Sequence, residues 1–348
     1  MDYTKQYINN SVIIEDKKKE VCVVSEQTFS SLSSLTTYKK VVDISKHHKI
    51  YGLTQNDYNE VLEKIKKQNC FLEYNYIYDK ISGTQIPLKD LVISANHNPN
   101  RYHALIQNRI NTLSNVAKEK NLSPLFMTLT LPSEFHKMKI DKKTKTLIPN
   151  PKYNHVTPKE AVKHLTKIFS RLRHDRSLKE LSKDERIYFR VNEPHKNGTP
   201  HTHVLLFVPK SSIDRVVTAF KRLFDNKAND IQTNIENATS YIMKYINKTL
   251  PLSKKENLSK KDKYLNAWYC KHRIIRFNCS RTLAPLSLYR LLHEKFNLKE
   301  LTSLVKKKSL SIFVLQTNRD KIMEIFNGDE LIYQRSENYT LRNGLLDF

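Results

Sequence analysis

Residues 186–208 read RIYFRVNEPHKNGTPHTHVLLFV, and this stretch decides the fold. Apolar and polar residues alternate over 186–193, which is typical of a strand with one buried face. Asn197-Gly198 is a strong signal for a hairpin turn, and an apolar strand follows it over 201–208. The stretch therefore predicts an antiparallel hairpin.

Further elements are predicted on both sides of this hairpin. Strands are expected over 125–131 and 230–235, and helices with one apolar face are expected over 158–172, 213–224 and 237–248. The order β-α-β-β-α-β-α predicts an α+β fold, with a central antiparallel sheet of split-βαβ type and helices on one face.

A breaker, Asn96-His97-Asn98-Pro99-Asn100, divides this central part from the residues before it. We therefore expect an N-terminal accessory region at 1–98 and a central domain that begins at residue 99. Within the first region, Thr54 is expected to cap a helix.

The composition favours a polyanionic partner. Sixty Lys and Arg against 35 Asp and Glu give a net charge of +25, although a generally lysine-rich surface would give the same number. The sequence has no apolar run long enough to span a membrane, no CxxC pair and no GxxxxGK phosphate loop. We expect a protein of a reducing cytosol, without a membrane partner or an ATPase of that type.

His201 and His203 form a candidate metal site. Residues two apart on a strand point to the same face, and the hairpin can bring Glu193 beside both rings. Two imidazoles and one carboxylate leave coordination positions open for a phosphate oxygen. An isolated HxH pair is more often packing than a ligand pair. His195, in the loop, is a weaker alternative to Glu193.

Tyr241 and Tyr245 share one face of the helix expected at 237–248, and Lys244 and Lys248 each follow a tyrosine by three residues. Nearby ammonium groups favour ionisation of a phenol and could assist its attack on phosphorus. Two tyrosines at this spacing are also common as packed core.

Three stretches resemble, in the same order, the motifs of the bacteriophage replication gene A proteins. They are FMTLTLPSEFH at 126–136, EPHKNGTPHTH at 193–203 and YIMKYINK at 241–248, with a weaker tail at 281–290. Three ordered motifs are far more specific than one. Thr202 departs from the pattern, since a bulky apolar residue usually separates the two histidines; its side chain is expected to point away from the metal.

This resemblance implies a rolling-circle replication initiator with an HUH endonuclease domain at 99–290. His201, His203 and Glu193 would hold Mg²⁺ or Mn²⁺. Tyr241 would attack the scissile phosphate of single-stranded origin DNA, giving a 5′-phosphotyrosine and a free 3′-hydroxyl, and Tyr245 would serve in strand rejoining. Which tyrosine acts first stays open.

The resemblance also implies a C-terminal accessory region at 291–348 and a cytoplasmic location in a bacterial host cell. A host helicase and a host DNA polymerase are the implied partners, and the terminal regions are free to recognise the origin or recruit a helicase. Thr128 and Thr130 either line the site or pack within their strand. Lysines at 159–179 and 210–227 could follow the DNA backbone, and Tyr188, Tyr264 and Trp268 could stack on bases.

Three other functions fit parts of the pattern. A transposase or mobilisation relaxase would use the same chemistry. A histidine-based phosphoesterase would not need the tyrosines and would form no protein–DNA adduct. A non-catalytic basic origin-binding protein would tolerate loss of both histidines.

Overall fold

The computed structural model describes residues 11–12, 24–25, 49–80, 82–141, 143–144, 146–253, 257–316, 321–336 and 339–344. The chain divides into two compact units, 1–48 and 49–348. The first unit is described only by two short antiparallel strands, β1 (Ser11–Val12) and β2 (Val24–Ser25). The candidate site lies in the second unit.

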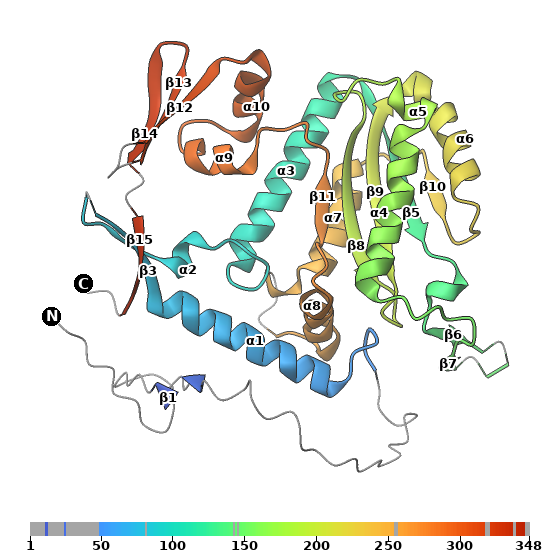
Figure 1. Ribbon diagram of the computed structural model, residues 1–348. Helices are drawn as coiled ribbons and strands as arrows, with labels where there is room; N and C mark the ends of the chain where they lie inside the picture. Colours follow the sequence, from blue (N-terminus) through green and yellow to red (C-terminus); the bar gives the residue numbers. More distant parts are fainter. Residues whose placement is uncertain are drawn as a thin grey trace. The chain divides into compact units, whose positions relative to one another are not determined.

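A five-stranded sheet in the order β10-β5-β9-β8-β11 carries the site (Figure 1). Its strands are β5 (Leu122–Thr130), β8 (Ile187–Pro194), β9 (Pro200–Pro209), β10 (Asp230–Gln232) and β11 (Phe277–Cys279). All neighbouring strands are antiparallel. Consequently β5 and β8 run in the same direction with β9 between them, and β9 and β10 do so with β5 between them. The α+β class and the predicted order of these elements are confirmed.

Helices cover both faces of this sheet, so the prediction of helices on one face is wrong. One face, with Leu125 and Leu206, packs on α4 (Pro158–His174) and α6 (Ile213–Leu223). The opposite face, with Phe126 and Leu205, packs on α3 (Pro99–Glu119) and α7 (Ala238–Thr249). The physical reason is that β5 and β9 are continuously apolar in their centres, and a sheet that is apolar on both faces needs cover on both.

Local signals in the sequence fix where the main helices begin. Thr54 caps α1 (Gln55–Tyr74) as expected, and Thr157 caps α4; both use a reciprocal capping box with the residue three positions later. Pro99 and Pro158 stand in the first turns of α3 and α4, where their missing N–H groups cost nothing.

Residues from the two terminal regions meet in a second sheet. β15 (Tyr339–Asn343) pairs with β3 (Asn75–Asp79), which also pairs with β4 (Gln85–Pro87). α1 packs on α8 (Lys260–His272) through Val61, Leu265 and their neighbours. The functional division at residues 98 and 290 stays a prediction.

The remaining elements surround these sheets. They are α2 (Leu88–Leu91), β6 (Met138–Ile140), β7 (Leu147–Pro149), α5 (Arg176–Lys179), α9 (Leu286–Leu292), α10 (Leu298–Lys307), β12 (Leu310–Gln316), β13 (Lys321–Asn327) and β14 (Glu330–Ser336). β12, β13 and β14 form a sheet in that order.

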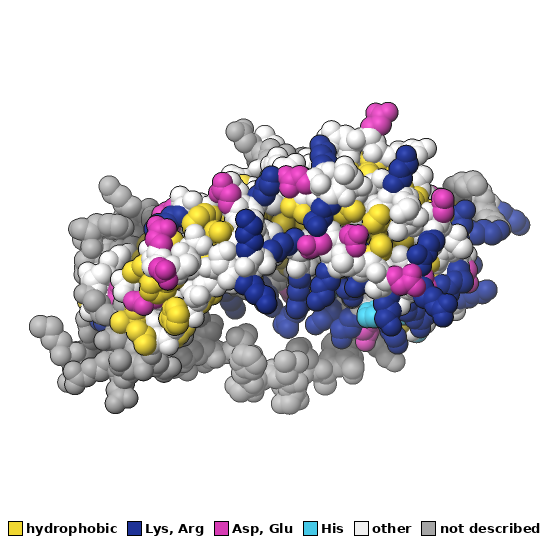
Figure 2. Space-filling model, turned by 90° about the horizontal axis from the view of Figure 1, so that it is seen from above, with side chains coloured by type: hydrophobic (Ala, Val, Ile, Leu, Met, Phe, Trp, Pro, Cys, Tyr) yellow, Lys and Arg dark blue, Asp and Glu magenta, His cyan; other side chains and the backbone are white. Residues whose placement is uncertain are grey.

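The surface seen in Figure 2 has two distinct parts. Lys and Arg side chains gather on the right of the view, where α4, α5 and α6 lie in Figure 1. Hydrophobic side chains show at the left, on the side of β12 to β14. No helix in the described parts of the chain has the length and apolarity needed to cross a membrane.

Candidate active site

The β8–β9 hairpin brings the three predicted metal ligands together. Glu193 lies directly opposite His201 in the register of the hairpin, and His203 lies two residues further along the same face of β9. Glu193 and His203 are buried, and the His201 side chain is 12% exposed. The predicted juxtaposition of the carboxylate and the two imidazoles is therefore present, and it comes from strand register and the two-residue period of a strand.

The ligand atoms are spaced as a metal site requires. The two Nε2 atoms of His201 and His203 are 3.0 Å apart, and Glu193 Oε2 lies 3.7 Å from the first and 3.8 Å from the second. A triangle with these sides has a point about 2.1 Å from every corner, within the metal–ligand distances seen for Mg²⁺ and Zn²⁺. These three residues can hold a metal ion.

The electrostatics of the cluster also suit a cation. Burial lowers the pKa of His203 to about 3 and lowers the pKa of His201 well below its ordinary value, so both rings are neutral and able to ligate near pH 7. Burial raises the pKa of Glu193, and the ammonium group of Lys248, 2.7 Å from Glu193 Oε2, opposes that rise. Glu193 Oε1 is buried without a hydrogen-bond partner.

Neighbouring hydroxyls orient this part of the hairpin. Thr128 Oγ1 lies 3.2 Å from His203 Nδ1, the ring nitrogen that faces away from the cluster. Thr128 therefore supports a candidate ligand, whereas Thr130 binds Asn229 through its backbone N–H. The Thr202 hydroxyl donates to Asn192 Oδ1 at 2.7 Å, which confirms that this side chain points away from the cluster.

Helix α7 places both predicted tyrosines over the same face of the sheet. The Tyr245 ring lies 3.9 Å, centroid to centroid, from that of His203. Tyr241 is one turn away: its ring contacts Phe126 edge-on, and its hydroxyl donates to Gln232 Oε1 at 3.1 Å. Tyr245 is thus the tyrosine nearer to the ligand cluster.

The two predicted lysines on α7 differ in their surroundings. Lys248 reaches back to Glu193, so the structure joins it to the metal ligands rather than to a tyrosine. Lys244 is exposed. Burial raises the pKa of the Tyr245 hydroxyl well above 10, and the Tyr241 hydroxyl and Glu193 add to this rise. The Tyr245 phenol is therefore protonated at neutral pH in the metal-free protein.

Sequence reasoning did not find the supports of the hairpin turn. Trp268 on α8 donates its indole N–H to Gly198 O at 3.0 Å. The turn at 50–53 packs against the same glycine, where an added Cβ would lie 2.4 Å from Tyr51 O. Asn197 Nδ2 donates to Met138 O and to His136 Nδ1, both at 3.1 Å. In the sequence, the Asn197-Gly198 pair indicated only that a turn with positive φ forms here. It could not indicate Trp268, Tyr51 or Met138 as supports, because these residues are distant in sequence.

Two suggested base-stacking residues change assignment in the structure, whereas His195 stays outside the ligand cluster. Trp268 and Tyr264 are 0% and 3% exposed, so the suggestion that they stack on DNA bases is wrong; both pack in the core between α1 and α8. His195 stacks on His201 with ring centroids 4.2 Å apart, yet it is not one of the clustered ligands.

Comparison with known proteins places the chain in a family. The sequence model of the bacteriophage replication gene A protein family matches residues 35–252, which is more than half of the chain. The chain belongs to this family. The match includes the ligand hairpin and α7, and it begins well before the segment in which the motifs were recognised.

Three relatives illustrate the similarity of this gene A family member. It is 32% identical over 184 residues to the replication protein of Haemophilus phage HP1, covering 48% of this chain and 22% of the relative. It is 28% identical over 227 residues to the replication gene A protein of Escherichia phage 186, covering 60% of this chain and 31% of the relative. A probable replication endonuclease from a prophage-like region of Salmonella typhi is 26% identical over 248 residues, and the match covers 63% of this chain and 30% of the relative. The chain thus spans less than a third of the length of each relative.

Proposed function

We propose that this chain initiates rolling-circle replication by nicking single-stranded origin DNA through metal-assisted attack of a tyrosine on phosphorus. The observation that carries the proposal is the Tyr245 ring, 3.9 Å from the ring of His203 within the Glu193–His201–His203 cluster. A nucleophile and three metal ligands in one site are the parts that such a reaction needs. The names of the relatives, which are replication proteins and replication endonucleases, support the replication role.

The cluster is proposed to hold Mg²⁺ or Mn²⁺. The equidistant point about 2.1 Å from the three ligand atoms and the unpartnered Glu193 Oε1 both support this assignment. A bound divalent cation would polarise the scissile phosphate and stabilise charge on its oxygens.

The chain's own residues supply the remaining chemistry. Tyr245 is proposed as the first nucleophile, because its ring and not that of Tyr241 contacts a metal ligand; this ranking reverses the order that we favoured from the sequence. The Tyr245 oxygen loses its proton and bonds to phosphorus as the bond to the 3′ oxygen breaks, and the departing 3′ oxygen gains a proton; this leaves a 5′-phosphotyrosine and a free 3′-hydroxyl. Tyr241, one helical turn away, serves as the second nucleophile in strand rejoining. Lys248, paired with Glu193, is proposed to neutralise charge at the metal ligands, and the exposed Lys244 is proposed to neutralise charge on the DNA.

The partners of this activity are proposed accordingly. Single-stranded origin DNA is the substrate. A host polymerase would extend the free 3′-hydroxyl, and a host helicase would unwind the duplex.

The test incubates labelled single-stranded DNA from the candidate origin with Mn²⁺ and wild-type protein, Tyr241→Phe, Tyr245→Phe or the double variant. Tyr188→Phe is the matched control, because Tyr188 packs on Phe169 away from the cluster. Denaturing gels should show a protein–DNA adduct that the double variant lacks and Tyr188→Phe retains. Cleavage without an adduct would instead indicate a phosphoesterase.

A second arm separates the nuclease from a non-catalytic DNA-binding protein. The double variant His201→Ala/His203→Ala should lose cleavage while keeping most of its affinity for DNA. Binding without cleavage by both the wild type and this variant would favour the non-catalytic function.

A further inference from the structure

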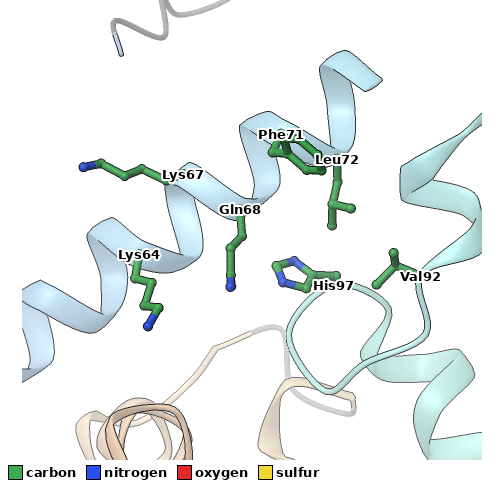
Figure 3. Close-up of a pocket in the computed structure, with 7 residues that line it drawn as sticks. All are labelled: Lys64, Lys67, Gln68, Phe71, Leu72, Val92 and His97. Atoms are coloured by element: carbon green, nitrogen blue, oxygen red, sulfur yellow. The ribbon is translucent and has the colours of Figure 1, made fainter. Parts of the chain in front are cut away.

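A pocket of about 430 Å³ lies between α1 and the segment that leads into α3 (Figure 3). Figure 3 shows the side chains of Lys64, Gln68 and Leu72 projecting from α1 towards the segment that carries Val92 and His97. These three α1 residues are four apart in sequence, so they share one helix face. The volume is in the range of about 300–1,000 Å³ typical of small-ligand sites.

The lysines of the pocket carry charge that the described residues do not neutralise. The acidic groups at the start of α1, Asp57 and Glu60, are paired with Lys271 at 3.0 and 2.5 Å. Lys64 and Lys67 form no ion pair within the described residues and line the pocket. Two ammonium groups therefore stand at the site, although Figure 3 shows the Lys67 side chain extending away from His97.

An aromatic side chain stands beside these charges. Phe71 lines the pocket and is 52% exposed, although exposing a phenylalanine ring to water is unfavourable. Leu72 and Val92 add apolar surface next to it. An exposed ring beside cations is the combination that single-stranded nucleic acids use, because bases stack on the ring while phosphates contact the cations.

Two polar groups complete the lining. His97 Nδ1 lies 2.6 Å from Asn69 Oδ1 and therefore carries the proton, which leaves Nε2 as an acceptor. Burial lowers the pKa of His97, so the ring is neutral near pH 7. The Gln68 amide can both donate and accept. Together they match the mixed donors and acceptors on the edge of a base.

We propose that this pocket binds one nucleotide of single-stranded DNA, with the base against Phe71 and the adjoining phosphates at Lys64 and Lys67. The assignment of DNA rests on the proposed function. An acidic peptide would satisfy the lysines, but it would leave the exposed ring and the two polar groups without a role.

The pocket is a positioning subsite and not part of the cutting machinery. α1 begins beside the turn at 50–53, which contacts Gly198 of the ligand hairpin. At about 1.5 Å per residue, Lys64 and Phe71 lie about 14 and 24 Å along the helix from its start.

The test measures affinity for fluorescein-labelled (dT)20 by anisotropy, using the full chain. Phe71→Ala should weaken binding about fivefold to a hundredfold, the effect of losing one stacked base. Phe313→Ala is the matched control, because Phe313 is 54% exposed in β12, outside the pocket. Equal affinities of the two variants would overturn the proposal.

Substitution of the lysines gives an independent readout. Lys64→Ala/Lys67→Ala should make the dependence of log affinity on log salt concentration less steep by about 0.7 for each lost phosphate contact. Lys66→Ala, on the same helix but outside the pocket lining, should leave the slope unchanged. A slope unchanged in the double variant would overturn the proposal. Displacement of (dT)20 by polyglutamate equally well from wild type and from Phe71→Ala would favour an acidic peptide.

The two proposals fail separately. Phe71→Ala should raise KM for nicking and leave kcat unchanged, whereas the double variant Tyr241→Phe/Tyr245→Phe should abolish the adduct without weakening (dT)20 binding. A chain that binds (dT)20 through Phe71 yet forms no adduct would refute the nuclease and keep the pocket.

Discussion

Replacing Gly198 with alanine tests the contact between the ligand hairpin and the turn at residues 50–53. Gly198 has φ of +89°, and an added Cβ would lie 2.4 Å from the backbone oxygen of Tyr51. The glycine cannot easily move away, because its carbonyl accepts the indole N–H of Trp268 at 3.0 Å. The hairpin and the turn must therefore separate, or the backbone must distort.

The expected loss has two parts. Placing alanine in the left-handed region costs about 1–2 kcal/mol. Forcing apart a packed contact costs a further amount of about 1–3 kcal/mol. Gly198→Ala should therefore lower the free energy of unfolding by about 2–5 kcal/mol. Gly83→Ala isolates the first part, because Gly83 has φ of +71° and its Cβ would meet nothing within 4 Å.

Urea unfolding followed by tryptophan fluorescence measures both variants. Trp268 is the single tryptophan of the sequence and is 0% exposed, so its emission reports directly on the packing behind the hairpin. If both variants lose the same stability within about 0.5 kcal/mol, the contact between Tyr51 and Gly198 does not support the hairpin and the reasoning fails.

Three further predictions concern the ligand cluster. Glu193→Gln should lower the affinity for Mn²⁺, measured by calorimetry, by at least about tenfold. A loss of affinity below about threefold would place the ion elsewhere. Thr128→Val should weaken it by about 10–100-fold, because the hydroxyl near His203 Nδ1 is removed, whereas Thr130→Val should have little effect. Burial lowers the pKa of His195 to about 4, below the value of about 6.5 in the unfolded chain, so the unfolded state binds more protons between these values. In EDTA the free energy of unfolding should thus fall as pH drops from 6.5 towards 4, and His195→Asn should make this dependence on pH less steep. The same dependence in both proteins would contradict its assignment to His195.

Much of the local structure was accessible from the sequence. The alternation over 186–193, Asn197-Gly198 and the apolar run after it predicted β8 and β9, and the structure has both strands. The same register placed Glu193 opposite His201, since a strand's two-residue period decides which side chains share a face. The helical spacing of Tyr241 and Tyr245 likewise predicted a shared face of α7.

The tertiary structure alone decided how these pieces are supported. Trp268 behind Gly198, Lys248 on Glu193 and the pairing of β15 with β3 join residues far apart in the chain. Turn preferences and periodicities act over a few residues, so a short window of sequence can express them. Contacts between distant segments depend on which buried faces and polar groups fit one another, and only the packed fold settles that.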